Sequence, residues 1–117
     1  MTGKQFEEYL YHLLSKKGYK VRLTKTTGDF GADLLLTSPT GKCIVVQVKR
    51  YKKNVGIKAV QEVGTAMPHY QASEAWVVTN SYYTKAACTL AKSNDVHLYN
   101  REDLINWIVK VKKTKVS

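Results

Sequence analysis

Apolar residues recur along the chain at two spacings, and the change between them separates predicted helices from predicted strands. Near the start, the helical spacing of three and four residues is kept by Phe6, Tyr9, Leu10, Leu13 and Leu14. Thr2 and Gln5 form a capping box that begins this helix at Gly3, and Gly18 follows its end. The first predicted element is therefore an amphipathic helix.

Three predicted strands follow this helix. Residues 19–25 alternate apolar and polar side chains, and a glycine-containing turn at 27–31 leads to a second strand at 32–37. A second turn at 38–41 makes a hairpin between this strand and residues 42–49. The last strand contains the almost unbroken apolar run Cys-Ile-Val-Val-Gln-Val, which predicts a strand buried on both faces at the centre of a sheet.

The second half of the chain alternates helices and strands. The pattern predicts a helix from Val55 to Met67, with Pro68 ending it or kinking its last turn. The later elements are a strand at 74–79, a helix at 84–93, a strand at 96–99 and a helix capped by Asn100. The order α-β-β-β-α-β-α-β-α indicates an α/β fold with a mixed central β-sheet flanked by helices. We expect one domain over residues 1–110 and a basic tail at 111–117 that frays.

The chain is strongly basic. Its 19 Lys and Arg residues and 9 Asp and Glu residues give a formal net charge of +10. This charge favours a nucleic-acid partner over the alternative of a ribosome-associated or merely basic soluble protein. Cys43 and Cys88 match no zinc spacing and are expected to be buried, reduced thiols. With no long apolar run and no apolar signal core, we expect a cytoplasmic protein without a membrane segment.

Two polar residues interrupt the predicted central strand on one of its faces. Side chains two positions apart in a strand share a face, so Gln47 and Lys49 point the same way as Val45. Ile44 and Val46 point the other way, into apolar core. An amide and an ammonium group at the end of a buried strand cost free energy unless they are paired, which makes both residues candidates for a functional site.

Asp33 begins the preceding strand, and hairpin pairing brings it opposite the end of the central strand. An acid, an amide and an ammonium group then meet at one end of the sheet, which suits metal-assisted phosphodiester hydrolysis. Asp33 and either the Gln47 side chain or the Val48 backbone carbonyl supply oxygen ligands for Mg²⁺. Lys49 orients water or stabilises the transition-state charge. Each residue alone has an ordinary explanation, such as a turn acid or a solvated strand end, and their combination favours the site.

Further candidates lie on the helices and beside the central strand. Glu7 falls at the margin of the first apolar stripe and can reach the sheet, although an acid at a helix start is also stabilised by the helix dipole. On the second helix, Gln61 is equally balanced between a supporting role and solvent, whereas solvent is preferred for Glu62. The exit from the central strand offers candidate DNA contacts in Arg50, Tyr51, Lys52 and Lys53. For Tyr51, Tyr70, Tyr82 and Tyr83 we prefer ordinary packing over base stacking or a subunit contact.

These candidates belong to longer motifs. Residues 27–33 are Thr-Gly-Asp-Phe-Gly-Ala-Asp, and residues 46–51 are Val-Gln-Val-Lys-Arg-Tyr. Together with weaker matches around Gly3-x-x-Phe6-Glu7 and on the later helices, they resemble the catalytic domain of Mrr-type restriction endonucleases. That family belongs to the PD-(D/E)XK nuclease superfamily, and here Gln-x-Lys replaces Glu-x-Lys. The resemblance covers nearly the whole chain and implies a restriction-endonuclease-like fold.

The resemblance also implies an active site of Asp33, Gln47 and Lys49, to which Glu7 contributes. It implies dependence on Mg²⁺, with Mn²⁺ as a substitute, and double-stranded DNA as the substrate. Cleavage of both strands would favour a homodimer. Two alternatives stay open: a DNA-binding or assembly module that has lost catalysis, which the neutral Gln47 supports, and a Holliday-junction-resolvase-like enzyme, which the same residue opposes.

Overall fold

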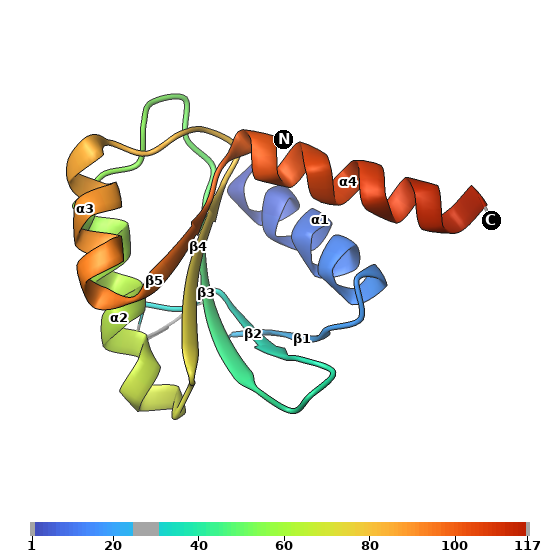
Figure 1. Ribbon diagram of the computed structural model, residues 1–117, viewed down its shortest axis with the longest axis horizontal. Coiled ribbons are helices and arrows are strands. Elements are labelled where there is room, and N and C mark those ends of the chain that lie inside the picture. Colours follow the sequence, from blue (N-terminus) through green and yellow to red (C-terminus); the bar gives the residue numbers. More distant parts are fainter. Residues whose placement is uncertain (1, 25–30, 117) are drawn as a thin grey trace.

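The computed structural model describes residues 2–24 and 31–116, with side chains up to residue 113. A five-stranded sheet lies at the centre, with helices on both of its faces (Figure 1). The elements are α1 (Gly3–Lys16), β1 (Lys20–Leu23), β2 (Leu34–Thr37), β3 (Cys43–Lys49), α2 (Ile57–Tyr70), β4 (Glu74–Thr79), α3 (Lys85–Asn94), β5 (Val96–Tyr99) and α4 (Arg101–Val116). Their order and the α/β class are those predicted.

The sheet is mixed, with the strand order β1-β2-β3-β4-β5. Strands β1, β2 and β3 pair antiparallel, and β2 and β3 form the predicted hairpin, in which Thr37 pairs with Cys43 and Leu34 with Val46. Strands β3, β4 and β5 are parallel, and their crossovers are α2 and α3. The apolar run of β3 therefore occupies the centre of the sheet, because this strand has a neighbour on each side and helices on both faces.

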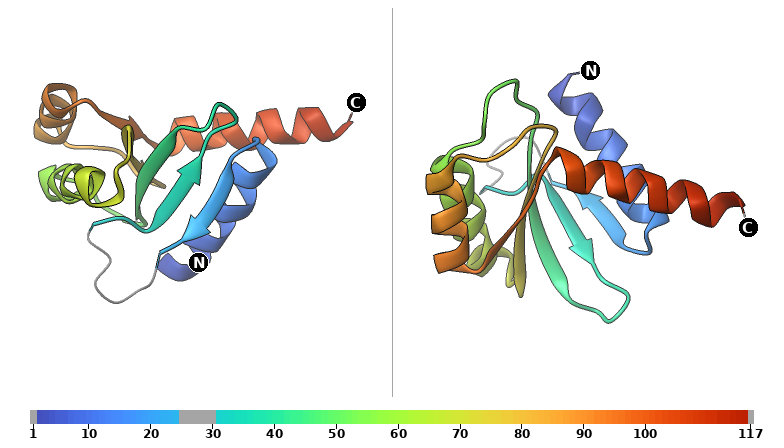
Figure 2. Two further views of the ribbon diagram at one scale, coloured as in Figure 1. Left: turned by 90° about the horizontal axis from the view of Figure 1, so that it is seen from below. Right: turned by 45° about the horizontal axis from the view of Figure 1, so that its top comes forward.

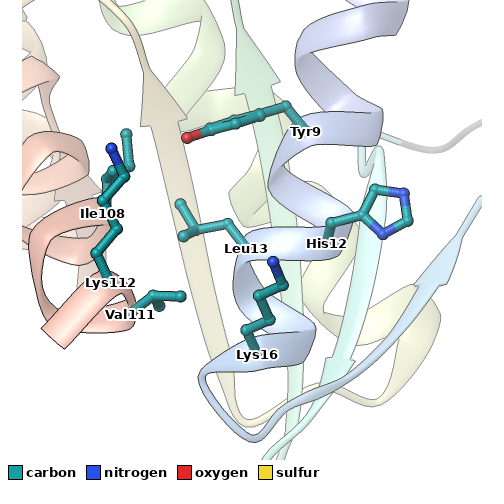
Figure 3. Close-up of a pocket in the computed structure, with 7 residues that line it drawn as sticks. All are labelled: Tyr9, His12, Leu13, Lys16, Ile108, Val111 and Lys112. Atoms are coloured by element: carbon teal, nitrogen blue, oxygen red, sulfur yellow. The ribbon is translucent and has the colours of Figure 1, made fainter. Parts of the chain in front are cut away.

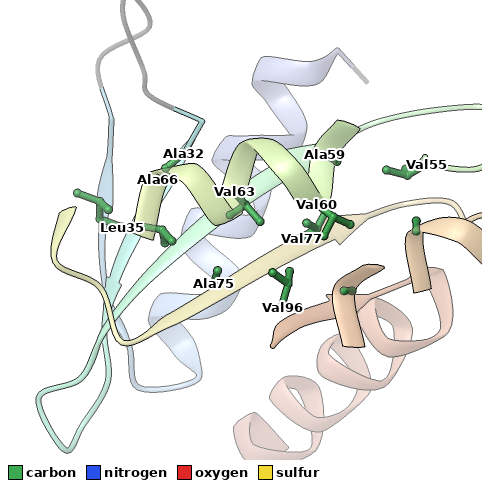
Figure 4. Packing of buried hydrophobic residues seen from close by; sticks show 13 residues of the cluster. Ala32, Leu35, Val55, Ala59, Val60, Val63, Ala66, Ala75, Val77 and Val96 are labelled. Atoms are coloured by element: carbon green, nitrogen blue, oxygen red, sulfur yellow. The ribbon is translucent and has the colours of Figure 1, made fainter. Parts of the chain in front are cut away.

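Two hydrophobic clusters hold the helices to the sheet. Beneath α2 and α3, Ala59, Val60, Val63 and Ala66 pack on strand residues that include Val45 and Val77 (Figure 4). On the other face, α1 and α4 cover a cluster that includes Leu10, Val46, Trp76, Val78 and Leu104. Because successive strand residues point to opposite faces, β3 contributes Val45 to the first cluster and Val46 to the second, as predicted.

The helix ends follow the sequence signals closely. The backbone N–H of Gln5 donates to the Thr2 hydroxyl, and its side chain accepts from the Thr2 N–H, which completes the predicted capping box. Gly18 follows α1 with a φ of +102°. Asn100 caps α4 by accepting from the backbone N–H groups of Glu102 and Asp103. No helix in the described ranges is both long and apolar enough to cross a membrane.

The structure excludes a helix end at Pro68 and full burial of the two cysteines. Pro68 lies within α2, which continues to Tyr70, because a proline in the last turn removes few helical hydrogen bonds. Helix α4 continues to Val116, Val111 packs on the cluster under α1 and α4, and the helix extends past the sheet (Figure 2). The division into a domain at 1–110 and a fraying tail at 111–117 stays a prediction. Cys88 is exposed, since α3 buries Ala87 and Ala91 instead. Cys43 is only half-buried.

Candidate active site

The carboxyl end of β3 presents polar side chains toward α2. Gln47 is 6% exposed. Lys49, two residues further on, has a side chain that is 21% exposed. Both share the face of Val45, which packs beneath α2. The alternation predicted for this strand is therefore confirmed. Gln47 and Lys49 lie at the edge of the contact between α2 and the sheet, which is otherwise apolar.

Asp33 lies just before β2, beside the carboxyl end of β3. Its backbone N–H donates to the Val46 carbonyl at 2.8 Å, and its carboxylate Oδ2 accepts from the backbone N–H of Val48 at 2.7 Å. A charge-assisted bond of this length fixes the orientation of the carboxylate. Val48 thus contacts Asp33 through its N–H group, and the role predicted for its carbonyl stays a prediction.

Gln47 links two backbone segments through its amide. Its neighbours orient the group, because only one orientation matches donors with acceptors. In that orientation, the amide nitrogen donates to the Gly31 carbonyl at 2.5 Å and the amide oxygen accepts from Lys49 Nζ at 3.2 Å. A buried amide satisfied on both sides is a stable arrangement. Gln47 therefore positions both the ammonium group and the chain leading into Asp33.

Gly31 brings this leading segment against α2. Its φ is +85°, in the region that favours glycine, and a Cβ atom here would overlap the backbone carbonyl of Glu62. Glycine is thus required both by the conformation and by the close approach. The preceding part of the predicted turn, including Asp29, lies outside the described residues.

Glu62 faces the site from α2. Its Oε1 atom lies 3.7 Å from Lys49 Nζ, and the Lys49 ammonium group also lies over the Tyr51 ring, 5.9 Å from the ring centroid. Although the Glu62 side chain is 37% exposed, Oε1 itself is buried and has no hydrogen-bond partner among the described atoms. The preference for Glu62 as an ordinary solvated residue was wrong.

The neighbouring Gln61 is exposed, and its carbonyl accepts from the Thr65 hydroxyl. The two residues differ because of their position on the helix. Glu62 follows the buried Ala59 by three residues and precedes the buried Ala66 by four, which places it at the margin of the packed face. Gln61 lies on the far side. The residue spacing thus contained a signal for Glu62.

Glu7 belongs to α1, whose apolar residues pack on the face of the sheet opposite to Gln47 and Lys49. Its side chain is half-buried, whereas Glu8 is exposed as expected. The contribution of Glu7 to the active site stays a prediction.

A basic, polar rim surrounds the carboxyl end of β3. Arg50, Tyr51, Lys52 and Lys53 are all exposed. The Tyr51 N–H donates to Asn80 Oδ1 at 2.9 Å, which ties this segment to the loop after β4. The two loops border a groove of about 510 Å³ lined by Tyr51, Lys52, Asn54, Asn80, Ser81, Tyr82 and Arg101. This groove offers positive charge and hydrogen-bond donors to an anionic ligand.

The predicted tyrosines separate into two groups. Tyr83 donates its hydroxyl in a shared bond to the carbonyl oxygens of Val77 and Tyr99, each at 2.9 Å. Burial raises the pKa of the Tyr83 phenol far above its ordinary value, so the hydroxyl stays protonated. Tyr70 is half-buried against the core, whereas Tyr51 and Tyr82 are exposed. Packing therefore accounts for Tyr70 and Tyr83 only.

Of two further pockets, one adjoins the candidate site and the other lies on the opposite face of the sheet. One of about 220 Å³ opens at the start of α2 and is lined by Lys49, Tyr51, Val55, Gly56, Lys58, Ala59 and Glu62. Gly56 offers no side-chain cap to α2, so the first N–H groups of the helix face this region. The other, of about 180 Å³, lies between α1 and α4 on the opposite face; Tyr9, Leu13 and Ile108 are among its lining residues (Figure 3). Its lining combines the aliphatic side chains of Leu13, Ile108 and Val111 with Tyr9, His12, Lys16 and Lys112, and it includes neither Lys49 nor Glu62.

A comparison with protein families assigns the chain to one of them. The model of the Mrr_cat restriction endonuclease family matches residues 1–108. The chain belongs to this family. The Mrr_cat match includes the strands that carry Asp33, Gln47 and Lys49, and it confirms the family resemblance stated above. No curated protein matches the chain.

Solved structures similar to this Mrr_cat domain share its fold. The DNA modification-dependent restriction endonuclease AspBHI is 19% identical, with a TM-score of 0.69 over 89% of this chain and 30% of its own. EndoMS in complex with double-stranded DNA is 17% identical, with a TM-score of 0.66 over 86% of this chain and 45% of its own. MspJI in complex with a 27-mer oligonucleotide is 17% identical, with a TM-score of 0.63 over 88% and 27%. The chain spans less than half the length of each.

The side chains present suit a hard divalent cation better than zinc. The described residues contain no group of three or more His, Cys, Asp or Glu side chains that could hold a metal ion, whereas zinc sites usually require three or four protein ligands. Mg²⁺ commonly binds one or two carboxylates and completes its shell with water and phosphate. The buried Glu62 Oε1, which has no hydrogen-bond donor among residues 2–24 and 31–116, and the Asp33 carboxylate held by Val48 N–H fit this requirement.

Proposed function

We propose that this domain is a DNA endonuclease that hydrolyses phosphodiester bonds of double-stranded DNA with a divalent metal ion. The observation that carries the proposal is the position of three groups at one end of β3. The Asp33 carboxylate is clamped by Val48 N–H, and the Lys49 ammonium group is held by the Gln47 amide. An acid and a cation fixed on neighbouring strands suit hydrolysis of a charged ester.

Asp33 and the Gln47 oxygen are the side-chain groups proposed to hold Mg²⁺, with the Val48 carbonyl as a backbone alternative and Mn²⁺ as a substitute. When bound, such an ion offsets the negative charge of the phosphate and makes water more acidic. The role proposed for Lys49 follows from its charge. An ammonium group near the reacting phosphate stabilises the negative charge that develops in the transition state. Gln47 keeps that ammonium group in place through the 3.2 Å contact.

Double-stranded DNA is proposed as the substrate because of the charge distribution and the relatives. The formal net charge is +10, and the exposed basic residues after β3 adjoin the groove that contains Lys52 and Arg101. The similar proteins EndoMS and MspJI were solved with DNA. We further propose that the domain acts as a homodimer, since cleaving two strands is best served by two sites related by a twofold axis.

The test is cleavage of supercoiled plasmid DNA with Mg²⁺, with Mn²⁺ and with a chelator. Asp33→Asn keeps the shape of the side chain but removes its charge, and it should reduce cleavage by about 100-fold or more. Glu8→Gln, which removes an exposed charge on α1, should cleave like the wild type. Equal cleavage by Asp33→Asn and the wild type would exclude the assigned site.

One observation favours a second candidate, a DNA-binding module without catalysis. Gln47 is neutral, and both ends of its amide are already engaged by Gly31 and Lys49. Tight binding of DNA that weakens steeply with salt, without cutting of plasmid, linear or branched DNA under any metal condition, would support this candidate over the endonuclease. Preferential cleavage of branched DNA would instead indicate a resolvase-like enzyme.

A further inference from the structure

We propose that Glu62, on α2, supplies the second acidic group of the metal site, in place of the acid that Gln47 does not provide. This inference rests on the proposed function. It names a catalytic residue that lies on a helix, outside the two motif strands. Its basis is a buried carboxylate oxygen, its neighbours and the charge of the site.

The first observation is the unmatched oxygen itself. Glu62 Oε1 is buried and accepts no hydrogen bond from any described residue, and Lys49 Nζ is 3.7 Å away from it. That separation is longer than a hydrogen bond. A buried carboxylate oxygen without a donor is costly, and such groups persist mainly where a ligand completes them. The remainder of the side chain is 37% exposed, so an ion from solvent can reach it.

The second observation explains why Gln47 is not itself an acid. Its amide nitrogen must donate to the Gly31 carbonyl while its oxygen accepts from Lys49. A glutamate at position 47 would place a carboxylate oxygen against the Gly31 carbonyl oxygen. Two hydrogen-bond acceptors would then face each other without a donor between them. This β3 position therefore requires an amide, and the negative charge has to come from another element.

The third observation is that the backbone of Glu62 contacts the segment that leads into Asp33. Gly31 packs directly on the Glu62 backbone, and the Gly31 carbonyl holds Gln47. The chain that leads into Asp33 is thus anchored to the turn of α2 that carries Glu62. Two pockets, of about 220 and 400 Å³, are each lined in part by Glu62, which leaves room beside the carboxylate for water and phosphate.

The charge of the site favours the same assignment. Asp33 and Glu62 contribute two negative charges and Lys49 one positive charge, so the site carries a net −1. Without Glu62 it would be neutral and would attract a divalent cation weakly. The competing explanation is that Glu62 only positions the Lys49 ammonium group, in which case its removal would affect cleavage but not metal affinity.

The experiment is a titration of the folded chain with Mn²⁺ in the absence of DNA, followed by calorimetry or by Mn²⁺ electron paramagnetic resonance. Glu62→Gln should weaken Mn²⁺ binding by at least about tenfold. Glu8→Gln removes the same charge from the opposite side of the sheet and should bind like the wild type. Circular dichroism checks the fold, and Glu62→Ala, which removes the side chain altogether, should weaken binding to the same extent.

A second readout is the concentration of Mn²⁺ that gives half-maximal plasmid cleavage, which should rise by a similar factor in Glu62→Gln. Unchanged Mn²⁺ affinity in both Glu62 variants, while Asp33→Asn loses binding, would overturn this inference and leave the proposed function intact. Unchanged affinity in Asp33→Asn as well, or no binding by the wild type, would overturn the metal site as a whole.

Discussion

On the face of the sheet covered by α1 and α4, the aromatic rings of Tyr19, Tyr99 and Trp107 pack around Trp76, with centroid distances of 4.9 to 6.1 Å. On the face covered by α2, β3 carries a buried amide and an ammonium group, and α2 adds a buried carboxylate oxygen from Glu62. Both faces are built from alternate residues of the same strands. The face under α1 and α4 stabilises the fold. The face under α2 has polar side chains in place of apolar ones at the carboxyl end of β3, and these polar groups are held in position.

This contrast predicts that substitutions on the face under α1 and α4 mainly lower stability, whereas substitutions on the face under α2 mainly lower activity. The largest stability loss is expected from Trp76→Ala. Trp76 is buried at the centre of the aromatic cluster, and its indole N–H donates to Glu74 at 3.1 Å. Removing this ring should lower the free energy of unfolding by about 3–5 kcal/mol. Urea denaturation measures the loss, and the fraction that stays folded should keep the Mn²⁺ affinity of the wild type.

Lys49→Ala should have the reverse effect. We expect cleavage to fall by about 10² to 10³, because the ammonium group stabilises developing charge on the phosphate. The midpoint of thermal unfolding should change less than in Trp76→Ala. The contacts of Lys49 with Glu62 and Tyr51 lie near the surface, and only its 3.2 Å contact with the buried Gln47 oxygen is lost from the interior. Lys92→Ala, on the last turn of α3, is the matched control for lost positive charge. A Lys49→Ala protein as active as this control would remove Lys49 from the proposed mechanism.

Gly31→Ala tests whether the site depends on the close approach between the chain before Asp33 and α2. The methyl group must adopt a positive φ and would also overlap the Glu62 carbonyl. We expect a destabilisation of about 1–3 kcal/mol. Gly41→Ala meets a similar φ, +90°, with open space around it, so it isolates the cost of the conformation. If both variants lost the same stability and Gly31→Ala kept full cleavage, the approach would not matter.

The smallest effect is expected at the rim of the site. Lys52→Ala and Arg101→Ala should each weaken DNA binding evenly across sequences and reduce the slope of log K against log salt by about 1. Both residues line the groove between the loops after β3 and β4. Fluorescence anisotropy with a labelled duplex at several salt concentrations measures the slope. An unchanged slope in both variants would place the DNA elsewhere.

Much of the architecture is local in origin and was predictable. Periodicity located every helix and strand, because burial of one face imposes a spacing of 3.6 in helices and 2 in strands. The same alternation placed Gln47 and Lys49 on one face of β3. Cap residues such as Thr2 and Asn100 form hydrogen bonds with residues within three positions of them, so the ends of these helices can be predicted from the sequence alone. Helix α4 continues past residue 110, where Val111 packs on the cluster under α1 and α4.

The amino-acid sequence by itself determined the order of elements, the central strand and the acid, amide and ammonium residues of the candidate site. The spacing of the buried Ala59 and Ala66 indicates that Glu62 lies at the margin of the packed face of α2, but only the tertiary structure decided that this margin meets Lys49. The rotation of α2 about its axis is set by Ala59, Val63 and Ala66 settling on the sheet, and its distance is set by contact with Gly31. The contacts of Glu62 with Lys49 and with Gly31 join residues 13 and 31 positions apart in the chain, where local patterns do not indicate which surfaces will meet.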